Sequence, residues 1–199
     1  MLLFTLFVGC FADDTYRQGV HLGIGFSPSF SYLLTSTESA GSQAVWYSNY
    51  LGGMSAEARV GWSKSEQKTS SFVSSLTWDY PSSHFAYSLF NGYAFTYYLN
   101  ETAPSKVFDF FGGLFYSNVA GLSNISGAWG TKIGAKAGYE FNKHLTFWVG
   151  CSIAGQIRSY SILATQISDA YEIMPIGTYS SRELIFPTSI LCSFSYSFF

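Results

Sequence analysis

Residues 129–156 read WGTKIGAKAGYEFNKHLTFWVGCSIAGQ, a stretch in which apolar and polar side chains alternate. One face of its first half carries Trp129, Ile133 and Tyr139, and the other carries glycine, lysine and glutamate. The same alternation resumes at Leu145, after a short polar break at residues 142–144. Alternation with a period of two indicates strands, and a short polar break between two such runs indicates a tight turn. The stretch therefore predicts a β-hairpin.

The length of the two strands indicates where the apolar face points. Each run extends over about ten residues or more, whereas strands of soluble proteins usually have about five or six. A tilted strand needs about 9–11 residues to cross a bilayer. In a membrane barrel the apolar side chains face lipid and the polar ones face the lumen, the reverse of a soluble sheet. We therefore expect an all-β protein, an eight-stranded antiparallel up-and-down transmembrane barrel.

The composition of the 199 residues agrees with a barrel of this size. Charged residues make up only 11% and aromatic residues 20%, whereas an ordinary soluble protein has roughly 25% charged residues. No apolar run reaches the roughly 18 residues of a membrane-spanning helix. A soluble β-sandwich, the alternative, would need a more highly charged surface. The net charge of −2 provides no basic patch for nucleic acid.

The chain divides into two expected segments. Residues 1–12, MLLFTLFVGCFA, are apolar, end in a small residue and precede Asp13 and Asp14. This pattern resembles a secretory signal peptide that is cleaved after Ala12, which leaves residues 13–199 as the barrel. The same segment also resembles, weakly, a lipoprotein cleavage box before Cys10, so lipidation of Cys10 remains an alternative.

Eight strands are expected, separated by connections of alternating length. The turns at 65–69, 100–106 and 142–144 are short, and the loops at 34–52 and 158–183 are long. Short periplasmic turns and longer extracellular loops are typical of outer-membrane barrels. One strand, at residues 84–99, would turn Asn91 toward lipid, which suggests either a β-bulge there or a different register of this strand. The expected strands are 16–33, 53–64, 70–79, 84–99, 107–118, 129–141, 145–156 and 184–198.

The pattern resembles the eight-stranded outer-membrane barrels of the OmpA/OmpX type over residues 16–199. The segments that carry the resemblance are GAKAGYEFNKHLTFW at 134–148 and the terminal FSYSFF at 194–199. The resemblance implies a Gram-negative outer-membrane location and a structural, adhesive or surface-interaction role. It also implies contact with outer-membrane lipid and lipopolysaccharide, insertion by the barrel-assembly machinery, and a monomer. The implied assembly signal consists of Phe194, Tyr196, Phe198 and Phe199.

The face opposite the apolar one predicts a charged lumen. Buried charges are costly unless they are paired, so we expect networks of ion pairs that plug the barrel. A narrow or gated conduit for ions or small solutes, as in a porin, is the alternative. The residues expected to point inward are Arg17, His21, Glu57, Arg59, Asp109, Lys132, Lys136, Glu140 and Arg158.

Catalytic and metal-binding patterns are weak in this sequence. No Ser, His and acidic residue occur at spacings that predict a triad, although a lipid-modifying hydrolase built from His21 or His144 remains a third alternative. No metal-ligand spacing is present, so no cofactor is expected. Cys151 and Cys192 fall on adjacent strands, where they either form a disulfide or face lipid as small apolar side chains.

The long loops are the candidates for binding an extracellular ligand, because function on a rigid scaffold tends to lie in its loops. Exposed aromatic side chains there can mark a binding surface. The alternative is that the same side chains pack against one another or extend the strands above the membrane, as Val45, Trp46 and Tyr47 could do. The candidates are Trp46, Tyr47, Tyr50 and Tyr171.

Overall fold

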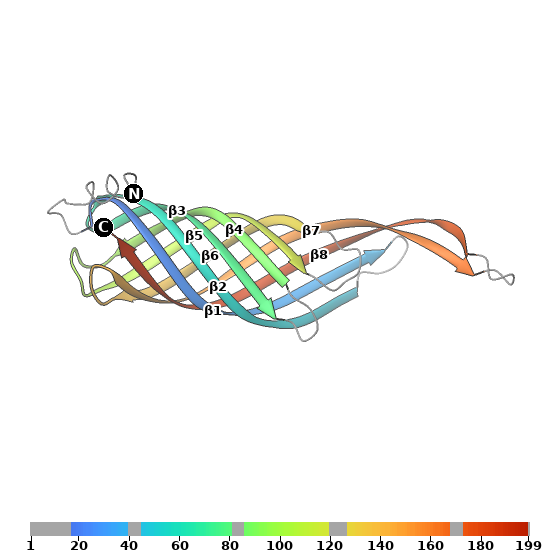
Figure 1. Ribbon diagram of the computed structural model, residues 1–199, viewed down its shortest axis with the longest axis horizontal. Helices are drawn as coiled ribbons and strands as arrows, with labels where there is room; N and C mark the ends of the chain where they lie inside the picture. The colour runs from blue at the N-terminus through green and yellow to red at the C-terminus, as the bar shows by residue number, and fades with distance from the viewer. Residues whose placement is uncertain (1–16, 40–44, 81–85, 120–126, 168–172, 199) are drawn as a thin grey trace, which may run out of the picture.

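The computed structural model describes residues 17–39, 45–80, 86–119, 127–167 and 173–198. These residues form eight antiparallel strands that close into a barrel in sequence order, with β8 paired to β1 (Figure 1). The predicted fold class is confirmed. The strands are β1 (Gly19–Ser39), β2 (Val45–Ser65), β3 (Lys68–Tyr80), β4 (Ala86–Tyr98), β5 (Ser105–Val119), β6 (Ala128–Glu140), β7 (Leu145–Ile167) and β8 (Ile173–Phe198).

Side chains alternate along each strand between the lumen and the outer face, as the sequence predicts. Polar side chains point into the lumen, where Lys136 is 6% and Asp109 0% exposed. Apolar side chains point outward, where Ile133 and Trp129 are each 63% exposed. The fold is thus polar inside and apolar outside. No helix of the described residues is long and apolar enough to cross a membrane.

The dimensions of the barrel match those of a bilayer. Strands β3, β4 and β6 each have 13 residues. With a rise of about 3.3 Å per residue and a tilt of about 40°, such a strand has a height of roughly 33 Å, close to a hydrocarbon core of about 30 Å. The outward apolar belt therefore has the height that lipid would cover.

Four strands continue well beyond the others at one end of the barrel. Strand β3 pairs with β2 only as far as Gly52 of β2. Strand β6 pairs with β7 only through its residues Gly130 to Glu140. Beyond these points β7, β8, β1 and β2 remain paired with one another and form what we call the projecting wall (Figure 1). The wall comprises residues 31–39, 45–51, 157–167 and 173–185.

The projecting wall corrects the prediction of long loops at 34–52 and 158–183. Both segments are largely strand, since β1 runs to Ser39 and β7 to Ile167. These strands are held by backbone hydrogen bonds to their neighbours, and such bonds do not require one face to be apolar. The segments can therefore be strands without the alternation of apolar and polar residues on which the prediction depended. The bulge predicted near Asn91 is also wrong, because β3 and β4 pair without a register shift and Asn91 is exposed on the outer face.

Candidate functional site

A layer of ion pairs crosses the middle of the lumen. Arg59 on β2 donates two hydrogen bonds to Asp109 on β5, Nη1 to Oδ1 at 3.0 Å and Nη2 to Oδ2 at 2.6 Å. Its Nε donates to Glu57 at 2.6 Å, and Lys136 on β6 donates to the second oxygen of Glu57 at 2.7 Å. Thr96 adds a hydrogen bond of 2.8 Å to Asp109. Three strands are thus joined by one continuous set of ion pairs, and the hydroxyl of Thr96 attaches β4 as a fourth.

The strand register explains why these side chains meet. Glu57 and Arg59 are two residues apart, so both point inward from β2. Asp109 lies directly opposite Lys136 and Thr96 in the β5–β6 and β4–β5 ladders. A buried carboxylate with a bidentate arginine partner is a strong, geometrically specific contact. The layer therefore consists of two positive and two negative side chains whose charges neutralise one another.

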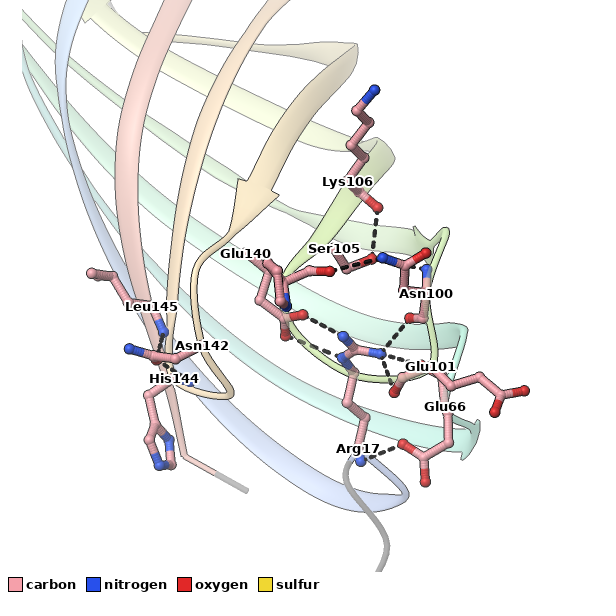
Figure 2. Close-up of polar contacts among 11 residues, drawn as sticks. Arg17, Glu66, Asn100, Glu101, Ser105, Lys106, Glu140, Asn142, His144 and Leu145 are labelled. Atoms are coloured by element: carbon pink, nitrogen blue, oxygen red, sulfur yellow. Dashed lines mark hydrogen bonds and ion pairs between the residues drawn. The ribbon is translucent and has the colours of Figure 1, made fainter.

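A second group of buried polar contacts lies at the end of the barrel where the turns are short. Figure 2 shows Arg17, just before β1, reaching across this end. Its guanidinium forms an ion pair with Glu140 at the end of β6, with Nε 3.1 Å from Oε1. Its Nη1 lies 2.8, 2.8 and 2.7 Å from the carbonyl oxygens of Glu66, Asn100 and Glu101, in two different turns. Arg17 is completely buried among these partners.

The wall of the lumen formed by β4 and β5 is aromatic. Phe90 and Phe111 contact edge to face with ring centroids 5.6 Å apart, and Phe115 lies in the same cluster. The ammonium groups of two lysines lie over these rings, that of Lys136 5.3 Å from the Phe111 centroid and that of Lys132 5.4 Å from the Phe115 centroid. Cation–π contacts of this kind stabilise a charge away from water.

Three small cavities follow one another along the lumen. The first has a volume of about 40 Å³ and lies toward the projecting wall, with Asp79, Lys132 and several serines in its lining. The second, of about 20 Å³, shares Lys132 with the first and contains Glu57. The third, also about 20 Å³, contains Glu57, Arg59 and His21. The ion-pair layer therefore lies between the second and third cavities, and the third cavity is on the Arg17 side, with Tyr98 in its lining.

Eight of the nine residues predicted for the lumen have described side chains, and all eight are inside the barrel. Six of them take part in the ion pairs, His21 lies beside Gly61, where a Cβ atom would be 2.1 Å from its ring, and Lys132 is set apart from the pairs. The side chain of Arg158 lies outside the described set. The sequence analysis missed Asp79, although its alternation with Phe72, Leu76 and Trp78 places it inward.

Three of the four predicted binding residues, Trp46, Tyr47 and Tyr50, lie on β2, so the alternative of an extended strand is confirmed for them and the loop assignment is wrong. Trp46 and Tyr50 are on β2 in the projecting wall, with exposed fractions of 55% and 79%. The ring centroid of Tyr50 is 5.2 Å from that of Tyr32 on β1. The side chain of Tyr47 and the whole of Tyr171 are outside the described residues. An exposed aromatic patch is therefore present on the wall.

The terminal aromatics and the cysteines face outward. Phe194, Tyr196 and Phe198 are all exposed on the outer face of β8, and Phe199 lies outside the described residues. Cys151 and Cys192 are free thiols, so the predicted alternative of a disulfide between them is not realised. They occupy the outer face as small apolar side chains.

The histidines do not assemble a catalytic group in the described part of the chain. His144 lies in the β6–β7 turn, its Nδ1 2.7 Å from the carbonyl oxygen of Ser197, with its ring stacked on Tyr196. His21 lies in the lumen beside Arg59. Among the described residues, no group of three His, Cys, Asp or Glu side chains is placed to hold a metal ion. Residues 1–16, with the expected signal peptide and Cys10, and His84 lie outside the description.

Comparison with known proteins supports the fold. No protein-family profile matches the sequence, and no curated protein sequence matches it. The outer membrane protein OprG from Pseudomonas aeruginosa has a similar structure, with a TM-score of 0.52 and 14% identity over 93% of this chain and 99% of that chain. Neisserial surface protein A gives a TM-score of 0.40 and 10% identity over 83% and 96% of the two chains. The chain therefore has the fold of the eight-stranded outer-membrane β-barrels of the OmpA/OmpX type.

Proposed function

We propose that the protein is an outer-membrane β-barrel of Gram-negative bacteria with a closed lumen, and that it acts at the cell surface through the projecting wall. The observation that carries the proposal is the ion-pair layer of Arg59, Glu57, Asp109 and Lys136, which spans the lumen from β2 to β6. A barrel that is closed in this way is a scaffold, so its function is expected on the surface that the scaffold displays.

The apolar belt supports the membrane location. Side chains such as Ile133 and Phe110, 63% and 58% exposed, would face water in a soluble protein but face lipid in a membrane. We propose contact with outer-membrane lipid and lipopolysaccharide, and insertion by the barrel-assembly machinery through the outward aromatics of β8. In this proposal the barrel is a monomer without cofactor or catalytic activity, and residues 1–12 are its signal peptide.

The wall supports a surface role. It projects beyond β3–β6 on one side of the barrel only, and it exposes the aromatic rings of Trp46, Tyr50 and Tyr32. Tyrosine and tryptophan provide large contact areas at low cost in conformational entropy and are enriched in binding surfaces. We propose that an extracellular ligand binds there.

The location is tested by gel migration of the outer-membrane fraction before and after boiling. A folded barrel resists detergent until it is heated, so we expect the two samples to migrate differently. A protein that is found soluble in the periplasm, with no such difference, would refute the membrane location. Cells that display the wild-type chain or the variant Trp46→Ala with Tyr50→Ala then test the surface role, because only the former should adhere to protein-coated surfaces.

A small channel is the second candidate, and the series of three cavities along the lumen is the observation that favours it. The two candidates differ in planar bilayers. Discrete conductance steps from the purified barrel would support the channel, whereas a closed lumen predicts a silent bilayer. A change in lipid acyl chains on expression, lost in His144→Ala or His21→Ala, would instead indicate a lipid-modifying enzyme.

A further inference from the structure

Positive and negative side chains are equal in number inside the described part of the barrel, but not all of them form ion pairs. Among the described residues, four positive side chains (Arg17, Arg59, Lys132 and Lys136) and four negative ones (Glu57, Asp79, Asp109 and Glu140) are enclosed by the strands. The ion pairs join Arg17 to Glu140, Arg59 to Asp109 and Glu57, and Lys136 to Glu57. One positive and one negative side chain, Lys132 and Asp79, are left outside these pairs.

Both remaining charges line the first cavity. Asp79 is 6% and Lys132 9% exposed, so each is more than nine-tenths buried. The carboxylate of Asp79 accepts one hydrogen bond, from Ser29 at 3.3 Å. The ammonium of Lys132 lies 5.8 and 5.4 Å from the centroids of Phe90 and Phe115, and in the described part of the chain no carboxylate forms an ion pair with it. The ammonium of Lys132 and the carboxylate of Asp79 therefore line one cavity without forming an ion pair with each other.

A buried charge is costly when it has no partner, and the cost is removed when a group of opposite charge arrives. A lone anion would satisfy Lys132 and leave Asp79, and a lone cation would do the reverse. A molecule that carries both charges satisfies both groups and keeps the lumen neutral. The rest of the lining offers hydroxyl groups, among them Ser31 and Ser189, whose oxygens are 2.8 Å apart.

We propose that the first cavity is a binding site for a small zwitterion, whose carboxylate pairs with Lys132 and whose ammonium pairs with Asp79. The cavity volume of about 40 Å³ limits the ligand to a few non-hydrogen atoms. Below the cavity the ion-pair layer closes the lumen, so the site is a dead end that holds its ligand and does not pass it on. The site goes beyond the proposed surface role, since it requires neither the projecting wall nor a partner protein.

The test is a titration of the full barrel, folded in detergent micelles, with glycine as the probe and saturation-transfer NMR as the readout. We expect saturable binding of glycine, and much weaker binding of acetate and of methylammonium, each of which carries only one of the two charges. Lys132→Met and Asp79→Asn should each weaken glycine binding by roughly tenfold or more, because each removes one charged hydrogen-bonding partner. Ser193→Ala, which alters the lining of the second cavity only, is the matched control and should bind as the wild type does.

A charge exchange makes the test independent of simple damage to the site. The double variant Lys132→Asp with Asp79→Lys keeps the lumen neutral, and a small zwitterion can bind it in the reverse orientation, so glycine binding should return. Gel migration before boiling verifies that each variant is folded. No saturable glycine binding by the wild type, acetate binding as tight as glycine binding, or single variants that bind as the wild type does would each overturn the proposal. Conductance and adhesion measurements do not depend on this site, so the proposed function and the binding site can fail separately.

Discussion

Replacing Arg17 with methionine should lower the free energy of unfolding by about 3–5 kcal/mol, the range measured when one partner of a buried ion pair is removed. The structure accounts for this size. Arg17 and Glu140 are 0% and 1% exposed, so Glu140 would remain as a buried carboxylate without its counter-charge. The carbonyl oxygens of Glu66, Asn100 and Glu101 would also lose a charged donor.

The pairing itself is isolated by a second substitution. In Arg17→Met combined with Glu140→Leu neither member of this pair is left as an uncompensated charge. The double variant should therefore be destabilised by at least about 1 kcal/mol less than the sum of the two single variants, within the coupling range of contacting residues. Lys106→Met is the control at the same end of the barrel, where the lysine is exposed. It should change the free energy of unfolding by no more than about 0.5 kcal/mol.

Urea unfolding of the barrel in lipid vesicles, followed by tryptophan fluorescence and gel migration, measures these free energies. The reasoning is refuted if Arg17→Met unfolds at the urea concentration of the wild type. It is also refuted if the two substitutions are strictly additive, because Arg17 and Glu140 would then stabilise the barrel independently of each other.

Three further outcomes are expected. Ile133→Arg places a charge on the apolar belt near the middle of the bilayer and should destabilise the barrel in vesicles by about 2–4 kcal/mol. Thr102→Arg, in an exposed turn, is the control and should be nearly neutral. Equal effects of the two substitutions on urea unfolding would argue against lipid contact at Ile133. Deleting residues 159–182 should leave the gel shift on heating intact, because the strands below the projecting wall pair with one another without these residues. Loss of the shift would show that the eight strands need the wall to close into a barrel. Cys151, which is exposed on the outer face, should react with a membrane-soluble maleimide much faster than with a charged one, and equal rates would place it in water.

The sequence was sufficient for the fold because the period of two is a local property. Lys132, Lys136 and Glu140 alternate with outward side chains within one strand, so their shared face follows from the spacing. The same spacing identifies the outer face of β8 at Phe194 and Tyr196. Most of the projecting wall was predicted as loop because segments such as TSTESAGSQ, at residues 35–43, consist of polar and small residues and carry no alternation.

The partners within the lumen could not be predicted, because they depend on the register between distant strands. Arg59 and Asp109 are 50 residues apart in sequence, and a shift of one residue between neighbouring strands would turn one of them outward. The separation of Lys132 from the ion pairs has the same origin. It depends on which charges the register brings within reach of one another, and only the folded barrel determines that.

The position of the Arg17 contacts has a consequence for assembly. Arg17 binds Glu140, a residue 123 positions later, and carbonyl groups in turns 49 and 83 positions later. The ion pair between Arg17 and Glu140 cannot form until β6 has joined the growing sheet. Contacts over such separations form late because they require large loops to close. An intermediate that contains only the first five strands would therefore leave the arginine without its carboxylate. The contact distinguishes a finished barrel from a partial one, and protection of Arg17 from a guanidine-modifying reagent would report completion.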